Sequence, residues 1–448
     1  VAVGCGSLDA NTTGNNNTAL GKDALGANTT AANNTSVGYE SLSKNTTGTS
    51  NTAIGQLALA ENTTADNNTA VGRLALYLNT TGTENTAVGS GALDSNTTAG
   101  CNTSIGHGSM GDNTEGANNA AVGRSALGSN TTGTSNVAIG RSSLTLNTTA
   151  TGNTATGAFS LNANTTGASN VGLGWQALTA NTTGCRNVAV GSLAGLAITT
   201  GIENVAIGYE SLKNEDAHGR NTAVGTQALF AQNAGADAYN VAVGYQAGAA
   251  ISTGVQNTMV GAFSGDGITT GQYNVGVGIH AVGSTTTASN NTGLGYNALF
   301  TNTTGHSNTA VGIYSLNNNT TGFCNVAIGK NALLANTTTC KNVAIGSDAL
   351  CSHTVNGVEN TAVGHGAQKS NTEGYYNTSV GKNSLVNVTT GDNNISLGRD
   401  SGADAVRNIT SGDNEIVIGN NSNGSAFIKI DWTVTSDLRD KTNIEDVP

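Results

Sequence analysis

The chain has 448 residues, of which 10% are charged, 4% are aromatic and one is proline, whereas 62 are glycine. So few large apolar side chains cannot fill the core of an ordinary globular domain of this length. The formal net charge of −11 is diffusely placed, so we expect no basic stripe that follows a nucleic-acid backbone, and no apolar run is long enough to predict a membrane span.

One stretch, Asn51–Thr64, recurs along almost the whole chain. Its glycine returns in steps of 17 residues as Gly21, Gly38, Gly55, Gly72, Gly89 and onward to Gly225. A fixed period of this kind indicates a repeat array, in which each unit buries its apolar side chains against the units before and after it. The period also excludes the simple disorder that the polar composition alone would suggest.

Counted from Asn51 as position 1, the repeat reads as a short strand, a glycine bend, a second apolar step and a polar turn. Position 2 is Thr or Val and position 4 is aliphatic, as in Ile54, so the two share one face of a strand. We expect position 4 to form a buried aliphatic ladder, position 9 (Leu59) a leucine ladder and position 1 an asparagine ladder with coil-to-coil hydrogen bonds. The following Asn-Thr-Thr-Gly run favours a turn.

These units predict an all-β fold, a parallel β-solenoid (a β-roll or β-helix) of 17-residue coils. Stacked strands lie about 4.8 Å apart, so roughly two dozen coils would make a rod on the order of 115 Å long.

A substitution pattern supports the core assignment. Where position 9 is glycine, an isoleucine replaces the turn asparagine three residues later. The pairs are Gly195 with Ile198, Gly248 with Ile251 and Gly265 with Ile268. One lost side chain is matched by one gained, so both positions should reach the same interior.

A single chain of these coils buries little apolar area for the backbone that it orders. We expect the small residues at position 3 to point outward and to let partner chains approach closely. The sequence therefore predicts a parallel homotrimeric fibre, with a monomeric solenoid as the alternative.

The chain divides into three predicted parts: a repetitive shaft at 1–398, an irregular last coil and transition strand at 399–435, and a charged segment at 436–448. Longer steps occur from Gly225 to Gly244 and from Gly346 to Gly364, and we interpret both as surface loops. The chain opens at Val1 in the middle of a coil, which predicts a fragment of a longer protein.

The segment Ser436–Ile444, with the pattern Ser-Asp-x-Arg-x-Lys-x-Asn-Ile, resembles the start of the endosialidase-type (peptidase S74-like) intramolecular chaperone domain of phage tail spikes and fibres. The resemblance implies that this domain trimerises the chain, assists folding of the stalk and releases itself by autoproteolysis. It assigns the serine at the cut to Ser436 and the activating lysine to Lys441. A neutral lysine amine can serve as the base for a hydroxyl nucleophile. The repeats are also loosely similar to the heads of trimeric autotransporter adhesins.

Other chemistry receives little support from the sequence. The six cysteines show no metal-ligand spacing, so we expect free thiols, with a disulfide between Cys324 and Cys340 as the alternative. Asn28, Asn45 and their equivalents fit the glycosylation sequon, but their recurrence favours a structural role. We expect no cofactor, no metal site and no enzyme activity apart from single-turnover cleavage at Ser436.

The sequence thus favours the shaft of a phage tail fibre or similar appendage, located on a virion tail or cell surface, that presents a tip to a host glycan or protein receptor. Two alternatives stay open: a bacterial trimeric surface adhesin, and a solenoid whose stacked threonines (Thr63, Thr64 and equivalents) bind ice.

Overall fold

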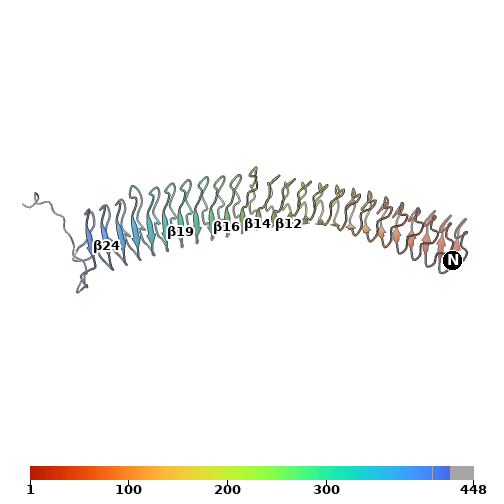
Figure 1. Cartoon of the computed structure of the whole chain (residues 1–448), viewed down its shortest axis with the longest axis horizontal. Coiled ribbons are helices and arrows are strands. Elements are labelled where there is room, and N and C mark those ends of the chain that lie inside the picture. The colour runs from red at the N-terminus through yellow and green to blue at the C-terminus, as the bar shows by residue number, and fades with distance from the viewer. Residues whose placement is uncertain (406, 424–448) are drawn as a thin grey trace, which may run out of the picture.

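The computed structural model describes residues 1–405 and 407–423, which form one curved rod (Figure 1). This part of the chain contains 25 strands and no helix. The strands are β1 (Ala2–Val3), β2 (Thr18–Leu20), β3 (Thr35–Val37), β4 (Thr52–Ile54), β5 (Thr69–Val71), β6 (Thr86–Val88), β7 (Thr103–Ile105), β8 (Ala120–Val122), β9 (Val137–Ile139), β10 (Thr154–Thr156), β11 (Val171–Leu173), β12 (Val188–Val190), β13 (Val205–Ile207), β14 (Thr222–Val224), β15 (Val241–Val243), β16 (Thr258–Val260), β17 (Val275–Val277), β18 (Thr292–Leu294), β19 (Thr309–Val311), β20 (Val326–Ile328), β21 (Val343–Ile345), β22 (Thr361–Val363), β23 (Thr378–Val380), β24 (Ile395–Leu397) and β25 (Ile416–Ile418).

Each strand pairs in parallel with the next strand of the chain, so that one sheet runs along the rod. The register joins residues 17 positions apart, such as Thr52 with Thr69 and Ile54 with Val71. The step grows to 19 residues between β14 and β15, and to 21 between β24 and β25, without breaking the ladder. The predicted all-β parallel solenoid of 17-residue coils is therefore confirmed.

The core is narrow and consists mainly of alanine and leucine. In the coil that begins at Asn51, the buried apolar residues include Ala53 at position 3, Ala58 at position 8 and Leu59 at position 9, each fully buried. The leucine row is buried from Leu25 onward, which confirms the predicted leucine ladder.

The predicted orientation of the strand is wrong. Position 3 points into the core, whereas position 4 lies on the outer surface, where Ile54 is 40% and Ile139 42% exposed. The reason is the width of the coil. A Cβ added at Gly172, a position 3 glycine, would come within 2.5 Å of Ser160 Oγ, so the interior accepts small side chains opposite position 8. The small residues at position 3 therefore do not face outward, and they cannot let partner chains approach closely as we predicted.

The glycine at position 5 has a structural reason in every coil. Gly55 has φ +135°, a backbone conformation that side-chain-bearing residues rarely adopt. A Cβ there would lie 2.5 Å from the carbonyl oxygen of Gly72 in the next coil. The bend and the coil spacing together exclude a side chain.

The exchange between positions 9 and 12 works as predicted. Position 9 is left-handed (φ 53° at Leu59, +57° at Gly195), so glycine enters it without strain. Ile198 is fully buried, and its Cδ1 lies 3.0 Å from where a Cβ of Gly195 would stand. The isoleucine thus occupies the space of the missing leucine.

Asparagine at position 1 forms the predicted ladder. The Asn34 Oδ1 accepts the backbone N–H of Asn51 at 2.9 Å, and the Asn51 Nδ2 donates to the carbonyl oxygen of Ala65 at 2.8 Å. Each buried amide therefore satisfies one group of the next coil and one group of its own coil, as buried polar groups require.

A second asparagine ladder occupies position 12, where the sequence suggested only a turn. The Asn62 Nδ2 donates to the Asn45 Oδ1 at 2.8 Å and also to the Ala65 carbonyl oxygen at 3.0 Å. The asparagines of the sequons, including Asn28, Asn45 and Asn62, are fully buried. Their amides are engaged inside the rod, which supports the structural interpretation of these repeats.

Candidate functional site

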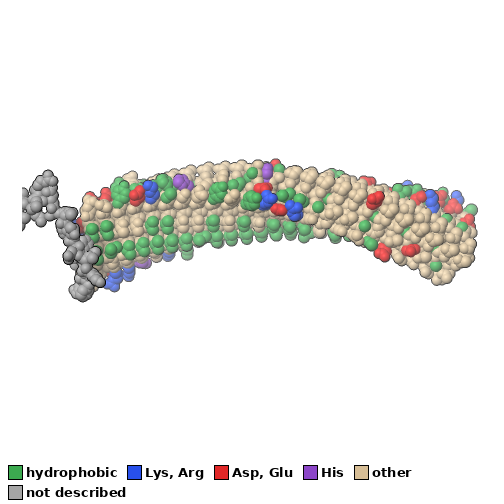
Figure 2. Space-filling model, in the orientation of Figure 1, with side chains coloured by type: hydrophobic (Ala, Val, Ile, Leu, Met, Phe, Trp, Pro, Cys, Tyr) green, Lys and Arg blue, Asp and Glu red, His purple; other side chains and the backbone are tan. Residues whose placement is uncertain are grey.

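The outer face of the strands, which we call the strand face, consists of positions 2 and 4 of each coil. Position 4 is aliphatic in nearly every coil, whereas position 2 is threonine in about half of the coils and valine in most of the others. Its position 4 row is half-exposed along the rod, from Leu20 (47%) through Ile207 (37%) to Leu397 (39%). Figure 2 shows hydrophobic side chains following the lower edge of the rod over many coils. Large continuous apolar surfaces of this kind are characteristic of interaction sites.

The threonine rows are less open than the ice-binding alternative requires. Thr63 at position 13 is half-buried, and its hydroxyl donates to the carbonyl oxygen of Thr80 in the next coil at 3.2 Å. Thr64 at position 14 is exposed. One threonine of each pair therefore belongs to the hydrogen-bonding ladder, and the other faces water.

The middle of the rod interrupts the position 12 ladder. This row reads Ile198, Glu215, Gln232, Ile251, Ile268 and Thr285 in six successive coils. Asn181, the last asparagine before the interruption, has a buried Oδ1 without a hydrogen-bond partner. The isoleucine that follows offers no amide to it.

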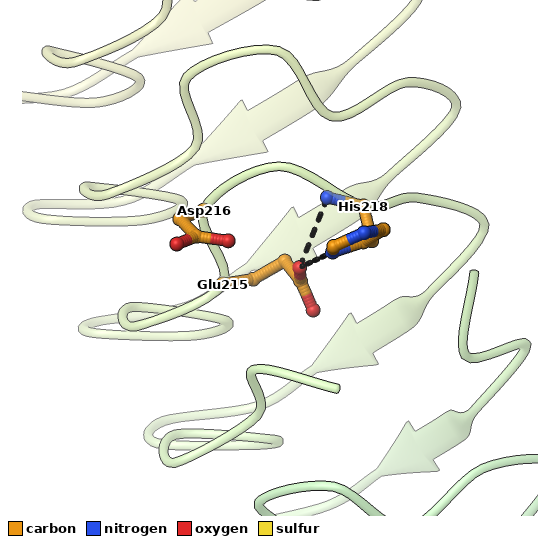
Figure 3. A group of neighbouring side chains, drawn as sticks. All are labelled: Glu215, Asp216 and His218. Carbon is orange, nitrogen blue, oxygen red and sulfur yellow. Dashed lines mark hydrogen bonds and ion pairs between the residues drawn. The ribbon is translucent and has the colours of Figure 1, made fainter. Parts of the chain in front are cut away.

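Glu215, Asp216 and His218 lie together in the turn of the coil that begins at Asn204, where Glu215 replaces the usual position 12 asparagine (Figure 3). Glu215 is fully buried, and its Oε1 accepts the backbone N–H of His218 at 3.2 Å. The His218 Nδ1 lies 3.9 Å from that same oxygen and has no hydrogen-bond partner of its own. Asp216 accepts the N–H of Ala217 at 2.5 Å.

Burial raises the pKa of Glu215 to about 7, because the charged carboxylate loses its hydration, and the nearby charge of Asp216 adds to the rise. Backbone hydrogen bonds from His218 and Asp216 offset only part of it. The Asn221 Nδ2 also donates to the Glu215 Oε2, at 3.5 Å. Near neutral pH the carboxyl group is therefore close to the midpoint of its titration.

Ligand atoms of the three side chains lie within 4.8 Å of one another, and carboxylates with an imidazole are donors that a divalent cation can take. The sequence predicted no metal site. No sequence pattern singled out these three residues as a group. An alignment of the repeats would have marked Glu215, because it stands at position 12, which is asparagine in most coils.

Ion pairs link successive coils beside the cluster, along the row of position 17 residues. Arg220 pairs with Glu203 of the preceding coil at 3.0 Å, with Asp237 from the longer step between β14 and β15, and lies over the ring of Tyr239. Arg186 joins the same Glu203 at 2.9 Å. These pairs fix the longer loop predicted between Gly225 and Gly244 to the side of the rod, and they lower the pKa of Glu203 through its hydrogen bonds.

The predicted cleavage residues Ser436 and Lys441 lie outside the described residues. The six cysteines are free thiols, including Cys324 and Cys340, so the alternative of a disulfide between them is not formed. Burial raises the pKa of the Cys340 and Cys351 thiols, which disfavours their reactive thiolate forms.

Fold and surface define the class of this protein: a parallel β-solenoid repeat rod with an apolar strand face. Among the described residues, no helix has the length and hydrophobicity to cross a membrane. No protein-family model matches the chain, and a comparison with curated proteins finds no significant match.

Proposed function

We propose that this chain is the shaft of a phage tail fibre or a similar surface appendage, which holds a receptor-binding tip away from its anchor. The observation that carries the proposal is the in-register stacking of 25 parallel strands into one rod. Such a rod offers length, which is what a shaft needs. The Ser436–Ile444 segment adds support, because it resembles a chaperone that follows fibre stalks.

We also propose that three parallel copies associate through the strand face. With a coil rise of about 4.8 Å and an outer strand about 10 Å wide, the face offers about 1,100 Å² per chain. In a trimer each chain divides this face between two partners, so each contact buries about 1,100 Å² counted over both chains, just above the roughly 1,000 Å² that a biological interface needs. The exposed aliphatic row of position 4 would form this contact, because position 3 faces the core.

The oligomeric state tests the second proposal. Mass photometry of the chain should give three copies per particle, and lysines at Ile139, Ile207 and Ile328 should shift the particles to one copy. Leu78 and Leu146 are equally exposed, at 40% and 47%, but lie at position 11, away from the strand face. Lysines at these two positions should leave the trimer intact. One copy per particle for the unmodified chain would refute the trimer.

The tail-fibre proposal is tested at the C-terminal segment. Expression of the complete coding sequence should yield a released C-terminal fragment, and Ser436→Ala should abolish the release. Release from both versions would contradict self-cleavage at Ser436. A coding sequence that ends without a chaperone domain would contradict the tail-fibre interpretation and favour the adhesin alternative.

A further inference from the structure

Position 6, the residue after the strand-ending glycine, forms a row that concentrates positive charge. It holds seven of the chain's 17 Lys and Arg residues and no Asp or Glu in any described coil. These seven are Lys22, Arg73, Arg124, Arg141, Lys330, Lys382 and Arg399. The cations are therefore not diffusely placed, as the unaligned sequence suggested, but gather in one row. The adjacent position 7 carries the acidic residues Asp23, Glu40, Glu210, Asp348 and Asp400.

Most of these cations face water without an acidic partner. Lys22 and Arg399 pair with the adjacent Asp23 and Asp400, at 3.5 and 3.0 Å. Within the described part of the chain, the other five form no ion pair, and all five are exposed. An edge with unpaired cations is complementary to an anionic partner.

The central coils replace the cations of this row with aromatic side chains. Trp175, Tyr209 and Tyr245 are 50%, 49% and 49% exposed. They occupy every second coil, with the small residues Ser192 and Thr226 between them, so successive rings stand about 9.6 Å apart along the rod.

Neighbouring aromatic residues at position 7 support part of this platform. Phe263 contacts Tyr245 edge-on with ring centroids 5.2 Å apart, and Phe263 in turn stacks on His280 at 5.0 Å. Tyr314 supports Tyr296 in the same way at 5.4 Å. Rings held in place before binding lose little freedom when a ligand stacks on them.

We propose that this position 6 edge binds a linear, acidic, β-linked polysaccharide along the rod. In an extended β-linked chain alternate sugar rings present the same face in one direction, which suits a large aromatic ring in every second coil. The apolar faces of the sugars stack on Trp175, Tyr209 and Tyr245, and their acidic groups pair with the flanking cations. The inference rests on the proposed function in placing the rod outside the cell that it contacts, but not on the oligomeric state.

The pattern does not suit a nucleic acid. A phosphate backbone needs cations at regular intervals, and the coils from Trp175 to Ile313 carry none at position 6.

Affinity electrophoresis tests the proposal with two polymers that share a β-linked glucose backbone. Carboxymethylcellulose is anionic and hydroxyethylcellulose is neutral. The full chain should be retarded by carboxymethylcellulose, and replacing Trp175, Tyr209 and Tyr245 together by alanine should weaken the retardation roughly tenfold or more. Glutamine at Arg124, Arg141, Lys330 and Lys382 should weaken it further and should abolish the difference between the two polymers.

Matched controls separate this edge from general stickiness. Tyr273 and Tyr376 are as exposed, at 50% and 54%, but lie at position 17, so their replacement by alanine should leave the retardation unchanged. Circular dichroism verifies that each variant keeps its β-structure. Three outcomes would each overturn the proposal. They are no retardation by carboxymethylcellulose, an equal loss of retardation for the position 6 and position 17 aromatic variants, and equal retardation by oligothymidylate. Binding by a chain whose complete coding sequence ends without a chaperone domain would leave this inference standing and contradict the tail-fibre proposal alone.

Discussion

The coils before Asn187 and the central coils from Asn187 to Asn291 stack their strands in the same parallel ladder but satisfy their interiors differently. In the first region, each position 12 asparagine bonds its copy in the adjacent coil, as Asn62 does with Asn45. In the central region, that row holds isoleucine, Glu215, Gln232 and Thr285, and buried polar atoms without partners appear, among them Gln232 Nε2 and Thr285 Oγ1. Each buried amide of the ladder depends on the equivalent side chain in the adjacent coil for its hydrogen bond. A substitution in one coil therefore leaves polar groups of the coils beside it without partners.

The backbone common to both regions should be the hardest feature to change. Gly72→Ala should destabilise the rod by about 3 to 5 kcal/mol, because the new Cβ meets the Gly89 carbonyl oxygen in a strained backbone conformation. Urea unfolding followed by circular dichroism measures the effect. Gly91→Ala is the matched control: φ is +63°, and only the Asp94 side chain lies within 4 Å. Equal losses for the two variants would contradict the clash.

The pH dependence of Glu215 should distinguish the central region from the regular coils. Its pKa is about 7 in the folded rod against an ordinary 4.5, so the folded state binds the proton more tightly, and stability falls as pH rises from about 4.5 to 7. Glu215→Gln should remove this penalty. It should raise the free energy of unfolding by on the order of 3 kcal/mol at about pH 8.5 and change it little near pH 4.

Gln232 occupies the same position in the next coil and is fully buried, so a glutamine has room there. Its Oε1 accepts from Asn240 Nδ2, although its Nε2 has no partner. Chemical unfolding at several pH values measures the difference between Glu215→Gln and the unmodified chain. A Glu215→Gln effect that is independent of pH would show that the carboxyl group does not carry the penalty.

Restoring the regular pattern in a central coil sharpens the comparison further. Gly195→Leu alone should destabilise the rod by about 1 to 3 kcal/mol, because Ile198 already fills the space. Adding Ile198→Asn should recover the loss and give the unpaired Asn181 Oδ1 a donor. A double variant no more stable than Gly195→Leu would contradict the exchange. Thermal unfolding of both variants measures it.

The smallest effect is expected at the surface of the regular coils. Lys44 pairs with Glu61 of the next coil at 2.7 Å, and the lysine is largely exposed. Because exposed ion pairs contribute little, Lys44→Gln should leave the melting temperature unchanged within error. A clear drop would show that surface charge stabilises the stack more than the buried ladders suggest.

The sequence by itself determined the period, the parallel solenoid, the glycine bend, the leucine ladder and the position 1 asparagine ladder. These follow from local chemistry repeated at a fixed interval, and the exchange of Gly195 with Ile198 marked the core directly.

Only the tertiary structure decided which face of the strand is buried. Alternation defines two faces, but the narrow coil selects Ala53 for the inside and leaves Ile54 outside. The same holds for the buried bonds of Asn62, the cluster at Glu215 and the cationic and aromatic edge at position 6. Each depends on which residues of adjacent coils come to lie above one another, and on how much room the coil leaves between them.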